Sequence, residues 1–102
     1  MTVLQNSIVG ALCHTHHTRI AREMALEKLQ FVDLYEKRHV LASALTISQR
    51  KRLEIARALC TTPRLILLDE VMGGLNPTEV REMLQLIEKI REAGNTLFVI
   101  EH

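Results

Sequence analysis

Apolar residues along this chain recur with a helical period in some segments and form short continuous runs in others. Between about Thr18 and Phe31 they return every three or four positions, which predicts an amphipathic helix. A second helix is predicted to begin near Thr46, because Thr46 and Gln49 have the spacing of a capping box, and to stop before Pro63. Residues 1–14 and 33–43 show no strong period.

The second half of the chain alternates between apolar runs and a helical pattern. Residues 65–68 are four consecutive aliphatic residues, which predicts a fully buried strand. Asn76 and Pro77 are suited to cap and start a helix, and Gly94 to end it. A second buried strand is predicted at 96–100. Strand, helix and strand in this order indicate a parallel βαβ unit, so the fold class is α/β. The predicted apolar stripe of the helix comprises Val80, Met83, Leu84, Ile87 and Ile90.

Two adjacent carboxylates follow the first of these runs. Asp69 and Glu70 stand at the predicted carboxyl end of a parallel strand, where open α/β sheets place their ligand sites. The pair suits Mg²⁺, or one metal contact beside a general base. A solvated acidic turn is the alternative, and these residues by themselves do not decide between the two.

Three cations, Arg50, Lys51 and Arg52, fall in the first turn of the helix that begins near Thr46. Cations at this end of a helix oppose its dipole. Either an anion binds there, or the three side chains extend into water or toward carboxylates elsewhere in the fold. Cys13, His14, His16 and His17 cluster in sequence, but their spacing matches no standard zinc pattern, and an exposed helical segment is the expected role.

Composition narrows the class of protein. The 102 residues carry a formal net charge of +1 with 3% aromatic residues, which gives no strong case for nucleic acid or an anionic membrane. No apolar run approaches the roughly 20 residues of a membrane span, and no signal peptide is visible. Cys13 and Cys60 are far apart and indicate reduced thiols in the cytosol.

Four motifs resemble those of ABC-transporter ATPases, in that family's order. Residues 45–59, which include Leu-Thr-Ile-Ser-Gln, resemble the signature motif and the helix after it. Residues 63–70 resemble the Walker B strand, Gly74-Leu75-Asn76 resembles the D-loop, and His102 resembles the switch histidine. The opening residues 1–6 and the run 52–59 are similar to ATP-binding subunits of branched-chain amino acid importers.

The resemblance implies a role for each matching residue. Asp69 would hold Mg²⁺, Glu70 would act as general base, and His102 would contact the γ-phosphate of ATP. Asn76 would couple the two sites of a dimer. Three residues of the signature segment would face ATP bound to the partner subunit: Thr46, Ser48 and Gln49. Phosphoryl transfer depends mainly on positioning and charge stabilisation, which suits such distributed contacts.

The resemblance also implies an arrangement and a setting. A helical-subdomain segment, 1–45, precedes a segment 46–102 that carries the signature helix, Walker B strand, D-loop, helix and switch-histidine strand; together they form part of a P-loop NTPase domain. The implied cofactors are ATP and Mg²⁺. The implied partners are a second ATP-binding subunit and membrane permease subunits, with no nucleic acid and no direct membrane insertion. The implied location is cytoplasmic, peripheral at the inner face of the cell membrane.

The sequence departs from the family pattern in several places. No G-x-x-x-x-G-K-[ST] phosphate loop occurs, so the chain by itself is expected not to hydrolyse ATP. Ile47 and Ser48 replace the two signature glycines, and Val71 replaces the usual proline after the glutamate. Two other functions stay open: a non-catalytic truncated remnant, and a fragment of a chromosome-maintenance or DNA-repair ATPase.

Overall fold

The computed structural model describes residues 1–101 of the chain, which divide into two compact units. The first unit is Met1–Thr62 and the second begins at Pro63. His102, the predicted switch histidine, lies outside the described residues. None of the helices within residues 1–101 is both long and apolar enough to cross a membrane.

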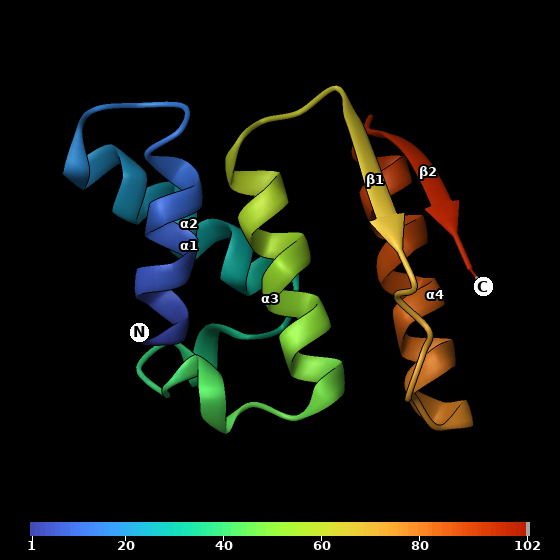
Figure 1. Ribbon diagram of the computed structural model, residues 1–102. Helices are drawn as coiled ribbons and strands as arrows, with labels where there is room; N and C mark the ends of the chain where they lie inside the picture. Colours follow the sequence, from blue (N-terminus) through green and yellow to red (C-terminus); the bar gives the residue numbers. More distant parts are fainter. Residues whose placement is uncertain (102) are drawn as a thin grey trace. The chain divides into compact units, whose positions relative to one another are not determined.

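Three α-helices form the first unit: α1 (Val3–Ala11), α2 (Thr18–Phe31) and α3 (Ile47–Cys60). Each packs against the other two (Figure 1). The helices predicted from about 18 to 31 and from 46 are confirmed, and α3 begins with the predicted capping box. The connector between α2 and α3 contains two short 3₁₀ turns, Tyr35–Lys37 and Ala42–Ala44.

Helix α1 occupies the segment that showed no clear period. Thr2 and Gln5 cap it, since the Thr2 hydroxyl accepts from the Gln5 N–H at 3.1 Å and the Gln5 side chain accepts from the Thr2 N–H at 2.8 Å. Its first turn is tied to the connector by the Val3 N–H, which donates to the Val40 carbonyl at 2.9 Å. The start of the chain is therefore anchored within the first unit.

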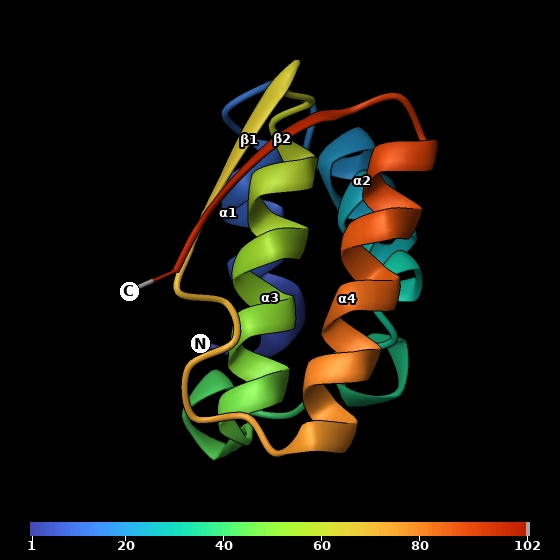
Figure 2. The same cartoon turned by 90° about the vertical axis from the view of Figure 1, so that its right-hand side faces the viewer.

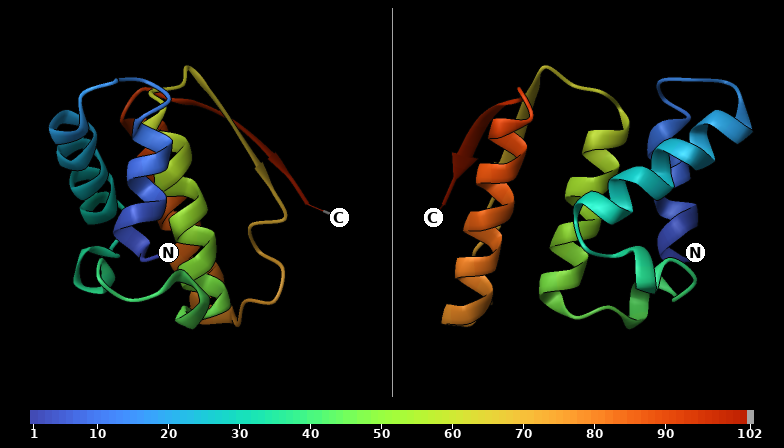
Figure 3. Two further views of the ribbon diagram at one scale, coloured as in Figure 1. Left: turned by 60° about the vertical axis from the view of Figure 1, so that its left-hand side comes forward. Right: turned by 180° about the vertical axis from the view of Figure 1, so that it is seen from behind.

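The second unit is a βαβ unit. Strands β1 (Leu65–Asp69) and β2 (Thr96–Ile100) pair in parallel, with Leu65 opposite Thr96 and Asp69 opposite Ile100. Helix α4 (Pro77–Glu92) connects them and covers one face of the sheet (Figures 1 and 3). Figure 2 shows the loop that carries the chain from the end of β1 to the start of α4. The predicted parallel strands and intervening helix are confirmed.

The predicted full burial of the strands is wrong. Ile66 and Leu68 are buried, but Leu65 and Leu67 are 60% and 61% exposed, and Phe98 on β2 is 59% exposed. Successive side chains of a strand point to opposite faces, and α4 covers only one face of this two-stranded sheet. The apolar run therefore has one covered side and one open side.

The apolar stripe predicted for α4 is correct in part. Met83 and Ile90 are fully buried, whereas Leu84 is 52% exposed and Leu86 takes its place in the core. Leu86 lies three residues after Met83 and four before Ile90, so these three share one face of the helix.

Candidate functional site at the end of the first strand

The carboxylate pair lies where the sequence placed it. Asp69 is the last residue of β1, and Glu70 follows immediately; both are exposed. The Glu70 N–H donates to the carbonyl of Ile100 at 2.7 Å. The backbone of Glu70 is thus fixed to the last residue of β2.

Glu70 has an uncommon backbone conformation. Its φ of +54° lies in the left-handed region, which side chains with a Cβ adopt rarely. Val71 follows it and is only 6% exposed. The chain therefore turns sharply after β1, leaving the Glu70 side chain in solvent and Val71 inside the fold. A turn after β1 could be expected from the sequence, but its left-handed backbone could not, because residues with a Cβ rarely adopt positive φ.

Asn76 caps α4, as the sequence predicted. Its side-chain oxygen accepts from the Glu79 N–H at 2.8 Å, while the Asn76 N–H donates to the Glu79 carboxylate at 3.0 Å. The cap uses the oxygen of the Asn76 amide and not its nitrogen.

The signature residues lie in the first unit, at the start of α3. The Thr46 hydroxyl accepts from the Gln49 N–H at 3.2 Å, and the Gln49 side chain accepts from the Thr46 N–H at 3.0 Å. Ser48 is buried, and Ile47 is 52% exposed. Two of the three side chains predicted to face ATP thus already form the helix cap.

The compact units divide the motifs differently from the sequence. Helix α3 belongs with α1 and α2, so the unit boundary follows Thr62, whereas the predicted segments were 1–45 and 46–102. The predicted division follows the order of the motifs, and the compact units follow packing. Within the second unit the structure brings Asp69 and Glu70 together, with Asn76 at the start of the next helix.

Of the three cations in the first turns of α3, Arg52 contacts the end of α2. Its guanidinium donates to the Val32 carbonyl at 3.0 Å and lies 3.9 Å from the Asp33 carboxylate. This matches the alternative in which these side chains reach groups elsewhere in the fold. Arg52 is therefore a link between α3 and the end of α2.

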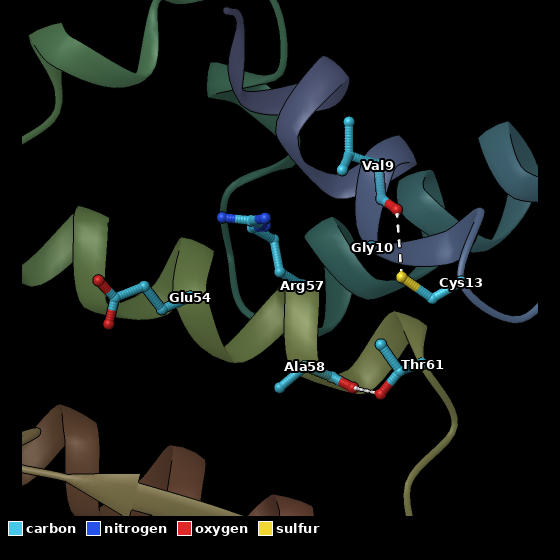
Figure 4. A pocket seen from close by; sticks show the side chains of 7 residues that line it. All are labelled: Val9, Gly10, Cys13, Glu54, Arg57, Ala58 and Thr61. Carbon is cyan, nitrogen blue, oxygen red and sulfur yellow. Dashed lines mark hydrogen bonds between the residues drawn. The ribbon is translucent and has the colours of Figure 1, made fainter.

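A groove that the sequence did not indicate lies between α1 and α3 (Figure 4). It encloses about 300 Å³. Gly10 forms part of its floor, where α1 comes so close to α3 that an added Cβ would lie 2.8 Å from the Arg57 carbonyl oxygen. Small residues at a helix contact are the signal that could have indicated it. The lining residues are Val9, Gly10, Cys13, Glu54, Arg57, Ala58 and Thr61.

Both cysteines are free thiols. Cys13 is exposed, while burial of Cys60 raises the pKa of its thiol to about 11. In the Cys13–His17 segment, His14 Nδ1 lies 3.1 Å from the Thr62 hydroxyl. Within residues 1–101 no three His, Cys, Asp or Glu side chains come together as a metal site would require.

The donor set at the end of β1 fits a hard cation. Mg²⁺ is bound through oxygen, usually by one or two carboxylates with several waters retained. Asp69 and Glu70 supply two adjacent carboxylates that are open to solvent. They could provide protein contacts to such an ion, and the remaining ligands would be water and phosphate oxygens.

Comparison with known proteins identifies the family. The sequence model of the ABC transporter family matches residues 1–73, which include both carboxylates. This chain belongs to the ABC transporter family. The predicted ABC ATPase fold is confirmed.

Individual ABC proteins extend the comparison. The chain is 44% identical over 85 residues to the high-affinity branched-chain amino acid transport ATP-binding protein BraF of Pseudomonas aeruginosa, covering 82% of the chain and 33% of BraF. It is 34% identical over 102 residues to the arginine transport ATP-binding protein ArtM of Bacillus subtilis, covering 99% of the chain and 42% of ArtM. The chain thus spans less than half the length of these relatives.

A solved ABC cassette has the same fold. The dimeric structure of MJ0796, a bacterial ABC transporter cassette, matches the whole chain and 46% of its own length, with 29% identity and a TM-score of 0.82. The likeness to transport proteins does not favour the chromosome-maintenance alternative.

Proposed function

We propose that this chain is the second half of an ATP-binding subunit that energises amino acid import, with branched-chain amino acids as the solutes. The observation that carries the proposal is the Asp69–Glu70 pair at the carboxyl end of a parallel strand in an ABC fold. The branched-chain type is supported by the likeness to two branched-chain amino acid transport proteins, BraF at 44% and LivG of Escherichia coli at 36% identity.

The carboxylates act on the metal and water side of the reaction. When bound, Mg²⁺ would supply charge neutralisation at the phosphates. Asp69 would hold the ion, and Glu70, exposed and one residue further, would orient the attacking water and accept its proton. His102 contacts the γ-phosphate, as its resemblance to the switch histidine implies.

The remaining roles belong to an assembled transporter. The start of α3, with Thr46, Ser48 and Gln49, faces ATP on a second ATP-binding subunit, and Asn76 couples the two sites. The dimeric form of the MJ0796 cassette supports this arrangement. Permease subunits are the other partners, and the subunit is placed at the inner face of the cell membrane.

Hydrolysis requires a phosphate loop, which these 102 residues do not contain. The purified chain should therefore show no Mg-ATPase activity. Clear turnover by the chain alone would contradict the requirement for that loop.

A chimera tests the complete proposal. This chain would replace its aligned segment in BraF, and the chimera would be expressed in a strain that lacks BraF. Restored uptake of radiolabelled leucine is expected, and the same chimera with Glu70→Gln should lose most ATP hydrolysis while keeping ATP binding.

A second chimera distinguishes the proposed solute type from the proposed role in ATP hydrolysis. The chain placed in ArtM, in a strain that lacks ArtM, should restore arginine uptake less well than the first chimera restores leucine uptake. Failure of both chimeras to hydrolyse ATP would contradict the catalytic proposal. Equal rescue of both would leave the ATPase role intact and overturn the branched-chain assignment.

A further inference from the structure

The chain leaves helix α3 through a residue in an unfavourable backbone conformation. Thr62 follows the end of α3 and has a φ of +49°, in the left-handed region. Two features of the sequence oppose this angle. Threonine is β-branched, and such residues adopt positive φ rarely, while the following Pro63 favours an extended conformation at Thr62. Contacts in the surrounding structure must therefore hold Thr62 in place.

The backbone of Thr62 supplies one of these contacts. Its N–H donates to the Leu59 carbonyl at 3.0 Å and closes the last turn of α3. A left-handed residue at this position commonly ends a helix with a second hydrogen bond, which the N–H of the next residue donates. The next residue here is Pro63, which has no N–H. The side chain of Thr62 is left to supply the remaining contacts.

The Thr62 hydroxyl has a partner on each side. It donates to the Thr61 carbonyl at 2.8 Å and lies 3.1 Å from Nδ1 of His14. A hydroxyl has one hydrogen, and here Thr61 accepts it. Toward His14 the hydroxyl is therefore the acceptor, and the hydrogen between the two residues is carried by Nδ1 of the imidazole.

His14 reaches Thr62 from a fixed backbone. The N–H of His14 donates to the Ala11 carbonyl at 3.0 Å, and the N–H of Thr15 donates to the same carbonyl at 3.1 Å. Ala11 ends α1 and is fully buried, and Gly10 beside it lies directly against α3. Backbone contacts thus keep the start of the α1–α2 loop, residues 12–17, in place without help from the imidazole.

From these contacts we propose that the α1–α2 loop is a strap: the Nδ1–H of His14 holds Thr62 in the left-handed conformation, and opening of this one hydrogen bond releases Thr62 and loosens the last turn of α3. Thr62 is the last residue of the first unit, so the strap sets the direction in which the chain leaves that unit. The contact is exposed, so it can open while the buried core stays folded. The inference is independent of the proposed function, in which neither residue has a role.

Urea unfolding of the full chain tests the strap through the equilibrium constant of unfolding. His14→Ala should raise this constant about threefold, the effect of one exposed hydrogen bond. His14→Asn should keep the parental value, because the asparagine amide nitrogen is a donor close to the position of Nδ1. His16→Ala, which replaces another exposed histidine of the same loop, is the matched control and should change nothing. No effect of His14→Ala would overturn the inference.

Two substitutions of Thr62 test the left-handed angle itself. Both Thr62→Gly and Thr62→Ala remove the hydroxyl, but only alanine keeps a Cβ that is strained at positive φ. Thr62→Ala should therefore have an unfolding constant about fivefold above that of Thr62→Gly. Adding His14→Ala to either variant should change nothing further, since its partner is gone. Equal constants for the two variants, or a threefold effect of His14→Ala in both, would overturn the inference.

NMR under native conditions gives a readout that a general loss of stability would not move. In His14→Ala the Thr62 amide should exchange its hydrogen faster by a larger factor than the Ala56 amide in the middle of α3. In the parent, the ¹⁵N resonances of the neutral His14 ring should place the hydrogen on Nδ1. Equal factors at the two amides, or a hydrogen on Nε2, would contradict the strap.

Discussion

Replacing Gly10 with alanine tests how closely α1 and α3 pack. An added Cβ would lie 2.8 Å from the carbonyl oxygen of Arg57 and 3.3 Å from its Cα. Both are backbone atoms in the last turn of α3, so they cannot move aside as the end of a flexible side chain would. The two helices would have to separate.

The size of the effect follows from two opposed contributions. Overpacking of a tight contact costs about 1–3 kcal/mol. Alanine is favoured over glycine inside a helix by about 1 kcal/mol, which offsets part of that cost. The free energy of unfolding should therefore fall by up to about 2 kcal/mol. In a domain of this size each kcal/mol lowers Tm by about 4–8 °C.

The measurement is urea unfolding of the chain followed by circular dichroism at the helix band. Val9→Ala serves as the control, because Val9 precedes Gly10 on the same helix and is 43% exposed. Its effect should stay within about 0.5 kcal/mol. A Gly10→Ala protein that is more stable than the parent would show that helix propensity outweighs the contact and would refute the close packing of α1 on α3.

Four further predictions concern caps, turns and thiols. Thr46→Ala removes the hydroxyl of the α3 cap and should destabilise the chain by about 1 kcal/mol in the same urea assay. Gly94→Ala should cost about 1–2 kcal/mol for backbone reasons alone, since Gly94 has a φ of +97° and open space around it; an unchanged midpoint would contradict that φ. Burial raises the pKa of the Cys60 thiol from 9.0 to about 11. The stability that the buried thiol contributes is therefore complete below pH 9 and is lost as the pH rises through about 11. Urea midpoints measured from pH 8 to 11 should reveal this loss. A thiol reagent at pH 8 should modify Cys13 rapidly and Cys60 only on unfolding; equal rates would contradict the burial of Cys60.

The sequence predicted three helices and both strands but missed α1, and the reason is the kind of residue that α1 buries. Two of its buried positions are Ser7 and Gly10, which do not register as apolar. The buried Ser7 hydroxyl is satisfied by the Val3 carbonyl at 3.2 Å. The Thr2–Gln5 spacing was a usable signal, since it equals the capping-box spacing that located the start of α3.

Burial of the strands could not be predicted from their residues alone. Continuous aliphatic runs are typical of parallel strands that are covered on both faces. Within the second unit only α4 covers the sheet, and Leu65, Leu67 and Phe98 are exposed. The run of apolar residues thus shows that the strand can be buried on both faces. The surrounding elements decide which of its faces is buried.

The position of the carboxylates could be predicted, but their backbone geometry could not. The end of an apolar run and two acidic residues are local features of sequence. The left-handed Glu70 donates its N–H to the Ile100 carbonyl, thirty positions away along the chain. Such contacts arise from tertiary structure, which periodicity does not report.

The cap of α3 changes how the signature segment can serve the proposed function. The side chains of Thr46 and Gln49 are hydrogen-bonded to each other's backbone, so a phosphate would have to compete with the cap for them. The first N–H groups of a helix have no partner inside the helix and are suited to anions. At α3 these belong to Ile47 and Ser48, the two residues that replace glycines. Their replacement keeps the backbone donors but sets the exposed Ile47 side chain beside them, so its effect on nucleotide binding should be steric and not a loss of hydrogen bonds.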